Sequence, residues 1–309
     1  MTIVFFGTPE FAVPSLRALV DAKHSVVLVV AQPDRPAGRG QNVHTPPTVE
    51  LAKAHGIAIA QPEKVRDPSF LDRIRALAPD AIAVAAYGKI LPKALLEIPR
   101  YGAINVHGSL LPKYRGAAPI QRAILAGESV TGVTIMLMNE RMDAGDILST
   151  RETPISPDDD AESLGRRLSV IGAEALGATL EGVERGTVTA VPQREEDATL
   201  APIIRKEEGE IDWAKGAAEI ERAVRAFRPW PGTFTHAGGK LLKIHRAAAH
   251  AGEPGKPPGT VLHADGGEIR VTTGEGALAL IELQLEGKRR LAAREFLAGG
   301  ALRAGDRLS

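Results

Sequence analysis

The 309-residue chain contains no cysteine, which excludes disulfide bonds, thiolate metal sites and a cysteine nucleophile. Only 4% of its residues are aromatic, so the hydrophobic core is expected to be mainly aliphatic. The formal net charge is zero, and no apolar run is long enough to span a membrane. The first residues also lack the basic region and the cleavage site of a secretory signal. These absences together predict a cytoplasmic protein.

The composition that remains is ordinary for a globular protein, with 44% hydrophobic and 25% charged residues. A chain of 309 residues is expected to form about two domains. From Arg205 onward there are 17 Lys and Arg against 14 Asp and Glu, a balance of +3, and before it 21 against 24, a balance of −3. This small asymmetry is compatible with a nucleic-acid partner for the second part of the chain but does not require one.

The beginning of the chain predicts an α/β fold. Thr2–Phe6 is apolar enough for a buried strand that ends at Gly7, Pro9–Lys23 has an amphipathic helical pattern, and Ser25–Ala31 is a second apolar strand. A strand, a turn, a helix and a strand open a doubly wound, mostly parallel sheet. The turn carries Glu10 and lacks the further glycines of a dinucleotide-binding motif, so a nicotinamide cofactor is not expected.

The first domain is expected to extend over residues 1–192. Between Gln32 and Pro47 the chain is polar and rich in proline, glycine and arginine, which predicts a long irregular loop of the kind that is often functional. Further helices are expected over Thr48–His55, Asp67–Ala78 and about 160–182, and further strands over Ile57–Ala60, Asp80–Ala86, Gly132–Met138 and Ile147–Ile155.

The stretch 193–204 is polar and without a clear pattern, which predicts a linker to a smaller domain over residues 205–309. That domain begins with a helical pattern over Ile211–Phe227. Short alternating segments separated by glycine and proline then predict a small β-barrel. The expected strands are Thr233–His236, Leu241–His245, Gly259–Ala264, Glu268–Thr272 and Leu278–Leu285, and a short helix is expected over Ala292–Leu297.

The most informative stretch surrounds a short buried strand predicted over Ala103–Val106. Asn105 and His107 lie two positions apart at its carboxyl end, so alternation along the strand places both side chains on one side. Ligands of open α/β sheets bind at this end of the strands. An amide that donates to an oxyanion and an imidazole that handles protons suit acyl transfer to an amine. The alternative is that both side chains merely satisfy backbone groups in a turn.

A carboxylate that orients these groups is expected from the turn 141–146, where Asp143 and Asp146 are rival candidates. Ser109 does not stand in a Gly-x-Ser-x-Gly elbow, so a serine nucleophile is weakly supported. The histidines are scattered without the spacing of metal ligands, and no metal is expected. Arg228 and Trp230 either stack on a nucleotide or form a rigid Arg-Pro-Trp-Pro corner.

The stretch from Asn105 to Gln121, Asn-Val-His-Gly-Ser-Leu-Leu-Pro-Lys-Tyr-Arg-Gly-Ala-Ala-Pro-Ile-Gln, resembles the 10-formyltetrahydrofolate-dependent formyltransferases. The resemblance runs nearly end to end and is closest to the members that act on methionyl-tRNA. Members that act on glycinamide ribonucleotide or amino sugars share the core motif, and the proline-rich loop and the second domain narrow the choice. The other matching segments are 6–12, 32–40, 132–136, 143–148, 206–213 and 225–232.

This resemblance implies transfer of a formyl group from 10-formyltetrahydrofolate to the α-amino group of methionyl-initiator tRNA. The family's Asn-x-His and following Asp motifs fall on Asn105, His107 and Asp143, and the match favours Asp143 over Asp146. The implied fold is a Rossmann-like formyltransferase domain followed by an OB-like β-barrel. The implied tetrahydrofolate-binding residues are Ser109, Leu110, Leu111, Pro112, Ile90 and Leu91.

The resemblance also implies contacts with tRNA. The loop after the second strand enters the acceptor stem, which gives Arg39 and Arg35 a role in holding phosphates or bases. The OB-like barrel offers a basic face, and binding to it is expected to weaken as salt is added. A monomer is expected. The competing functions are a formyltransferase that acts on a nucleotide-linked amino sugar or glycinamide ribonucleotide, and a folate- or RNA-binding protein without catalysis. The barrel residues expected to contact tRNA are Lys206, Arg228, Lys240 and Lys243.

Overall fold

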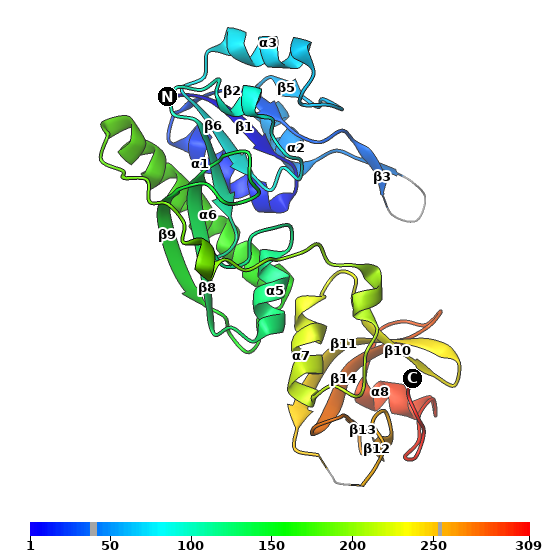
Figure 1. The fold of residues 1–309 in the computed structure, drawn as a ribbon. Coiled ribbons are helices and arrows are strands. Elements are labelled where there is room, and N and C mark those ends of the chain that lie inside the picture. The colour runs from blue at the N-terminus through cyan, green and yellow to red at the C-terminus, as the bar shows by residue number, and fades with distance from the viewer. Residues whose placement is uncertain (38–41, 253–254) are drawn as a thin grey trace. The chain divides into compact units, whose positions relative to one another are not determined.

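The computed structural model describes residues 1–37, 42–252 and 255–309, and the chain forms two compact units (Figure 1). Neither unit is continuous in sequence. Among the described residues, no helix is both long and apolar enough to cross a membrane. The domain boundaries expected at 192 and 205 stay a prediction. Unit 1 consists of Met1–Pro119, Val130–Pro154 and Gly165–Pro202, and unit 2 of Ile120–Ser129, Ile155–Leu164 and Ile203–Ser309.

Unit 1 is built on a seven-stranded sheet in the order β5-β2-β1-β6-β7-β8-β9. The chain moves outward from β1 to β2 and β5 and then starts again on the other side of β1 with β6, so the sheet is doubly wound. The strands from β5 to β7 pair in parallel, and β8 and β9 are antiparallel, which confirms the expected mostly parallel sheet. The strands are β1 Thr2–Gly7, β2 Ser25–Val30, β5 Ile59–Ala60, β6 Ala81–Ala85, β7 Ala103–His107, β8 Val130–Leu137 and β9 Ile147–Pro154.

The centre of this sheet follows from runs of apolar residues. Every residue of β6 and β7 is buried, as expected of parallel strands that are covered on both faces. Helix α3 begins after Asp67, which caps it as expected: the Asp67 carboxylate accepts a hydrogen bond from the Ser69 N–H at 3.1 Å. The helices of the first 202 residues are α1 Val13–Asp21, α2 Pro47–Ala54, α3 Pro68–Leu77, α4 Lys93–Leu96, α5 Pro119–Ala126 and α6 Ala161–Arg185, with short 3-10 turns η1 Glu10–Ala12 and η2 Glu195–Asp197.

Two expectations for unit 1 need correction. The stretch Gln32–Pro47 is not irregular throughout, because β3 Arg35–Ala37 pairs antiparallel with β4 Asn42–His44. Backbone pairing across a tight ribbon here prevails over the disruptive effect of proline and glycine. The helix expected over Pro9–Lys23 is shorter, since a 3-10 turn precedes α1. Arg39 lies outside the described residues.

Unit 2 contains an antiparallel sheet in the order β10-β11-β14-β13-β12, with β15 paired to β14. The last residues of the chain lie between the two edge strands: Leu308 bridges to Ala237 of β10, and Arg307 bridges to Thr260 beside β12. These bridges make the sheet an OB-like barrel, as expected. The strands are β10 Thr233–Ala237, β11 Lys240–His250, β12 Val261–Asp265, β13 Glu268–Thr272, β14 Ala277–Leu285 and β15 Leu291–Ala292, and the helical segments are η3 Lys206–Gly209, α7 Ala217–Ala226 and α8 Ala293–Ala298.

The helix expected over Ile211–Phe227 was wrong in its first half, because α7 begins only at Ala217. The Ile211 N–H donates to the carbonyl of Phe234 at 2.8 Å, and the Trp213 indole N–H donates to Thr235 Oγ1 at 3.0 Å. Ile211 and Trp213 are both buried in the core of unit 2. These apolar residues enter the core from a non-helical segment, and their long-range contacts prevail over the local helical pattern.

Tyr87 gives a stability prediction. It follows β6, is 2% exposed, and packs edge-on against Phe6 at a centroid distance of 5.1 Å. Within the described residues its hydroxyl is buried without a hydrogen-bond partner, and burial raises the pKa of Tyr87 to about 12. Since a buried unsatisfied hydroxyl is destabilising, Tyr87→Phe is expected to raise the free energy of unfolding by about 1 kcal/mol.

Denaturant unfolding of Tyr87→Phe and wild type measures this difference. The partly exposed Tyr101 provides the matched control, because Tyr101→Phe removes a hydroxyl that is not buried in the core. A loss of stability in Tyr87→Phe would show that the hydroxyl has a partner in solution and would contradict the prediction.

Candidate active site

Asn105 and His107 lie on β7, which is the strand where the sheet changes from parallel to antiparallel pairing. On the β6 side Asn105 is paired with Val84, and on the β8 side it is paired with Met136. Asn105 is 8% exposed and His107 is 5% exposed, so both polar side chains are held in a largely water-excluded setting. A buried amide and a buried imidazole on one strand are costly unless their polar atoms are used.

The imidazole of His107 faces oxygen atoms on both sides. Nε2 is 3.0 Å from the carbonyl oxygen of Tyr114, and Nδ1 is 3.7 Å from Oδ2 of Asp143. A carbonyl oxygen can only accept, so Nε2 carries the hydrogen in this arrangement. At 3.7 Å the Asp143 carboxylate is within ion-pair range but beyond hydrogen-bond distance, so the Nδ1–H of a protonated ring remains available to a developing oxyanion while Asp143 stabilises the positive charge.

Asp143 is held by the backbone of the motif that follows β7. Its Oδ2 accepts a hydrogen bond from the Gly116 N–H at 2.9 Å, and its own φ is 49°, in the left-handed region that aspartate tolerates better than most residues. Asp146, the rival candidate, uses its backbone carbonyl to accept from the Leu137 N–H at 2.8 Å. The structure thus brings Asp143 to His107.

Sequence reasoning missed three polar residues beside this site. Arg115 is 5% exposed, and its guanidinium donates to Gln193 Oε1 and to the carboxylate of Glu195. Gln193 in turn donates to the backbone of the Asp143 turn. Gln193 and Glu195 both fall in the stretch 193–204, which the sequence predicts to be a linker. The signal that could have identified Arg115 is that it is the arginine inside the central motif.

The segment expected to bind tetrahydrofolate forms a tight turn after β7. The Ser109 hydroxyl is fully buried and donates to the carbonyl of Lys113 at 2.7 Å, so it already has a partner within the turn. Thr134 of β8 donates to the Ser109 carbonyl at 2.7 Å and accepts from the Leu111 N–H at 3.0 Å. These bonds fix the backbone of Ser109–Pro112, with Leu111 buried and Leu110 and Pro112 partly exposed.

The two residues expected to line the pterin pocket differ in exposure. Ile90 is 81% exposed in the loop after β6, whereas Leu91 is 3% exposed and belongs to the core of unit 1. The loop after β6 lies beside the end of β7, because β6 and β7 pair in parallel. An apolar side chain as open as Ile90 is available to a flat ring system.

The expected tRNA contacts of unit 2 are also on its surface. Lys206 lies on η3, and Lys240 and Lys243 lie on β11, all three exposed. The guanidinium of Arg228 is 3.3 Å from the carboxylate of Asp160, so a tRNA phosphate would have to compete with this ion pair. In unit 1, Arg35 lies on β3.

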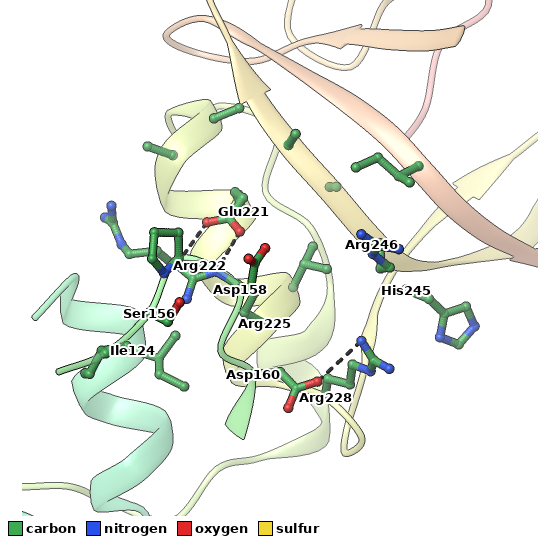
Figure 2. Close-up of a pocket in the computed structure, with 18 of the residues that line it drawn as sticks. Ile124, Ser156, Asp158, Asp160, Glu221, Arg222, Arg225, Arg228, His245 and Arg246 are labelled. Atoms are coloured by element: carbon green, nitrogen blue, oxygen red, sulfur yellow. Dashed lines mark hydrogen bonds and ion pairs between the residues drawn. The ribbon is translucent and has the colours of Figure 1, made fainter. Parts of the chain in front are cut away.

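A cavity of about 1040 Å³ lies within unit 2 and is lined by α7, β11 and the segment 155–160 (Figure 2). Arg225 forms hydrogen bonds with both carboxylate oxygens of Glu221, and Arg222 donates to the carbonyl of Leu125 at 3.1 Å. The charges on the cavity wall cancel, so it has no excess of positive charge for phosphates. The five arginines are Arg222, Arg225, Arg228, Arg246 and Arg290, and the five carboxylates are Glu128, Asp158, Asp160, Glu221 and Glu282.

In the parts of the chain that the structure describes, no three His, Asp or Glu side chains are grouped in a way that could hold a metal ion.

Comparisons with known proteins agree over both units. A family model described as "Formyl transferase" matches residues 1–180, and one described as "Formyl transferase, C-terminal domain" matches residues 203–301. A methionyl-tRNA formyltransferase of Geotalea uraniireducens (strain Rf4) is 50% identical over 299 residues, which cover 97% of this chain and 95% of that relative. One of Myxococcus xanthus (strain DK1622) is 50% identical over 303 residues, covering 98% and 96%.

Among solved structures, the chain is similar to the N-formyltransferase from Helicobacter canadensis in complex with folinic acid and dTDP-3-aminofucose. The TM-score is 0.69 at 17% sequence identity, and the match covers 94% of this chain and 99% of that one. At this identity the similarity shows the fold alone.

Proposed function

The chain belongs to the methionyl-tRNA formyltransferase family, and we propose that Asn105, His107 and Asp143 are the residues that carry out its reaction. It transfers a formyl group from 10-formyltetrahydrofolate to the α-amino group of methionyl-initiator tRNA and so produces N-formylmethionyl-tRNA for translation initiation. The observation that supports the three residues most directly is the distance of 3.7 Å between the buried His107 and the partly exposed Asp143, on a strand that also carries the buried Asn105.

The reaction needs no covalent intermediate with the protein. The uncharged amine attacks the formyl carbon, a carbon–nitrogen bond forms, and negative charge develops on the formyl oxygen. The amide of Asn105 and an N–H of protonated His107 stabilise that oxyanion in a site where water is largely excluded. The bond from the formyl carbon to the folate nitrogen then breaks, and the proton lost by the amine passes to this leaving nitrogen. Asp143 orients His107 or the water that carries the proton.

The donor and the tRNA each have candidate contacts. Ile90, Leu91 and the turn Ser109–Pro112 form the side of the site assigned to tetrahydrofolate, supported by the exposed Ile90 and the fixed backbone of the turn. The cations proposed to contact tRNA are Arg35 of β3, Arg39, which lies outside the described residues, and Lys206, Arg228, Lys240 and Lys243 in unit 2. Of the latter four, Arg228 is the weakest, because Asp160 already neutralises it.

The domain division and the location of the protein complete the proposal. We place the catalytic domain at 1–192 and the tRNA-binding domain at 205–309, and the two family matches at 1–180 and 203–301 support this division. The protein works in the cytoplasm, because initiator tRNA is charged and used there. A monomer is sufficient for this activity, because the proposed catalytic set comes from one chain.

A formyl-transfer assay with two acceptors tests the function. Wild-type protein is given 10-formyltetrahydrofolate and either methionyl-initiator tRNA or a nucleotide-linked amino sugar, and product formation is followed for each. Transfer to the tRNA with little or none to the sugar is expected. Well-folded protein that binds tetrahydrofolate and formylates neither acceptor would support the binding-only alternative, and preference for the sugar would overturn the tRNA assignment.

A further inference from the structure

The β8–β9 loop (residues 138–146) carries Asp143, but it begins at a distance from His107, the residue that Asp143 approaches. Leu137, the last residue of β8, is paired with Ile104, whereas His107 lies three positions further along β7. At about 3.3 Å per residue, the loop and its side chains must span roughly 10 Å back along β7 to bring Asp143 to His107. The loop returns to β8 at Gly145, where only a glycine fits, because a Cβ atom would lie 1.7 Å from the carbonyl oxygen of Leu137.

The side chain of Gln193 bonds directly to this loop. Its Nε2 donates to the carbonyl of Asp143 at 2.9 Å and to the carbonyl of Gly145 at 2.7 Å. Both acceptors are backbone oxygens on either side of Ala144, so one amide group clamps the turn that carries the catalytic carboxylate. Asp143 itself has φ 49°, a conformation that the surrounding structure must maintain.

The other end of the Gln193 amide is fixed by Arg115. The Arg115 guanidinium donates to Gln193 Oε1 from Nε at 3.0 Å and from Nη2 at 2.8 Å. A guanidinium only donates and a carbonyl only accepts, so the oxygen and nitrogen of the amide can be assigned without ambiguity. Arg115 is 5% exposed, which makes this contact largely inaccessible to water.

Glu195 completes the arrangement by joining Arg115 to the loop a second time. It accepts from Arg115 Nη1 at 3.1 Å and from Arg141 Nη2 at 2.9 Å, and Arg141 belongs to the β8–β9 loop. The hydrogen bonds from Arg115 and then Arg141 lower the pKa of Glu195, so it is a carboxylate at neutral pH. Glu195 is half exposed, and Gln193 is therefore the better protected of the two links.

We propose that Gln193, held by Arg115, is a positioning residue that sets Asp143 against His107 for formyl transfer. This inference rests on the proposed function, because it assigns Gln193 a role in that same site. Gln193 itself bonds to the backbone of the loop and acts on the reaction through Asp143. Its effect should appear in kcat, whereas binding of either substrate should be little changed.

Gln193→Glu tests the two hydrogen bonds from Gln193 Nε2 to the loop. Glutamate keeps an oxygen for Arg115 but replaces the donating NH₂ with a second oxygen, which would face the carbonyls of Asp143 and Gly145. A displacement of Asp143 by about 1 Å is expected to lower kcat by about 10- to 100-fold. KM for 10-formyltetrahydrofolate and for methionyl-initiator tRNA should stay within about twofold, because no group that contacts them is removed.

A double-mutant cycle separates positioning from general structural support. In an Asp143→Ala background, Gln193→Glu should change the single-turnover rate by less than about twofold, since the residue it positions is gone. Equal losses in both backgrounds, or wild-type kcat in Gln193→Glu, would overturn the proposal. Gln193→Met, which keeps the length of the side chain without polar atoms, serves as a second variant if Gln193→Glu unfolds.

Glu196→Gln is the matched control, because Glu196 is exposed on the same segment and pairs with Arg194 away from the loop. Its kcat should equal that of wild type. The activity of wild type in the same assay distinguishes failure of the Gln193 proposal from failure of the proposed function. If wild type is active and the effects of the two substitutions are additive, only the role of Gln193 is wrong. If well-folded wild type is inactive, the proposed function is wrong as well.

Discussion

Asn105→Ala is expected to lower kcat for formyl transfer by about 100- to 1,000-fold, the loss typical of removing one donor to an oxyanion. Asn105 is 8% exposed in the middle of the sheet, so water cannot readily replace its amide as a donor. The donor acts where charge develops in the transition state, and KM for both substrates should therefore change far less than kcat.

Single-turnover transfer to methionyl-initiator tRNA, measured beside thermal unfolding of the same samples, checks this result. Gln284→Ala is a suitable control, because it removes an amide that donates to the carbonyl of Lys288 on unit 2. Wild-type rates in a folded Asn105→Ala protein would show that the oxyanion is stabilised elsewhere. A variant that loses tetrahydrofolate binding together with transfer would point to a binding role for Asn105.

His107→Ala is expected to lower kcat by about 100- to 10,000-fold, because it removes both an N–H donor and the group that interacts with Asp143. His107→Gln should lose less, since an amide can still donate although it carries no charge. The comparison therefore divides the contribution of His107 into hydrogen bonding and charge. The rates are measured at saturating concentrations of both substrates, where product formation reports kcat.

The chain offers a close control for this second prediction. His263 Nε2 is 2.7 Å from Asp265 Oδ1 on β12, so His263→Ala also removes a histidine from a histidine–aspartate pair, but on the surface of unit 2. Its kcat should match that of wild type. Comparable losses in His107→Ala and His263→Ala would mean that transfer depends on overall histidine content or stability, and the assignment of His107 would be wrong.

Much of this fold could be predicted from the sequence because its central strands are buried on both faces. Every residue of Ala81–Ala85 is buried, so the run is continuously apolar and can be identified as a strand from its sequence. The same is true of the Asn105 and His107 pair, since strand alternation alone places two residues that are two positions apart on the same side. The choice between Asp143 and Asp146 came from family resemblance, and no local pattern would have made it.

The features that could not be predicted depend on contacts between distant segments. Trp213 lies within the pattern that predicts a helix, but its indole N–H donates to the hydroxyl of Thr235 on β10. Gln193 stands in a stretch with no periodic pattern, and its importance lies in two carbonyls almost fifty residues earlier in the chain. Neither spacing nor composition reports on such pairings, because both describe only neighbours along the sequence.

The proposed site is divided between strand β7 and the β8–β9 loop, and the backbone amides of these two parts are expected to exchange with deuterium by different routes. The amides of β7 are paired on both sides and should exchange with deuterium only when the whole unit unfolds. Those of the β8–β9 loop have fewer backbone partners and should exchange through local opening. Amide exchange is therefore expected to be faster at Asp143 than at Asn105 and His107, so one active site would contain two different exchange rates.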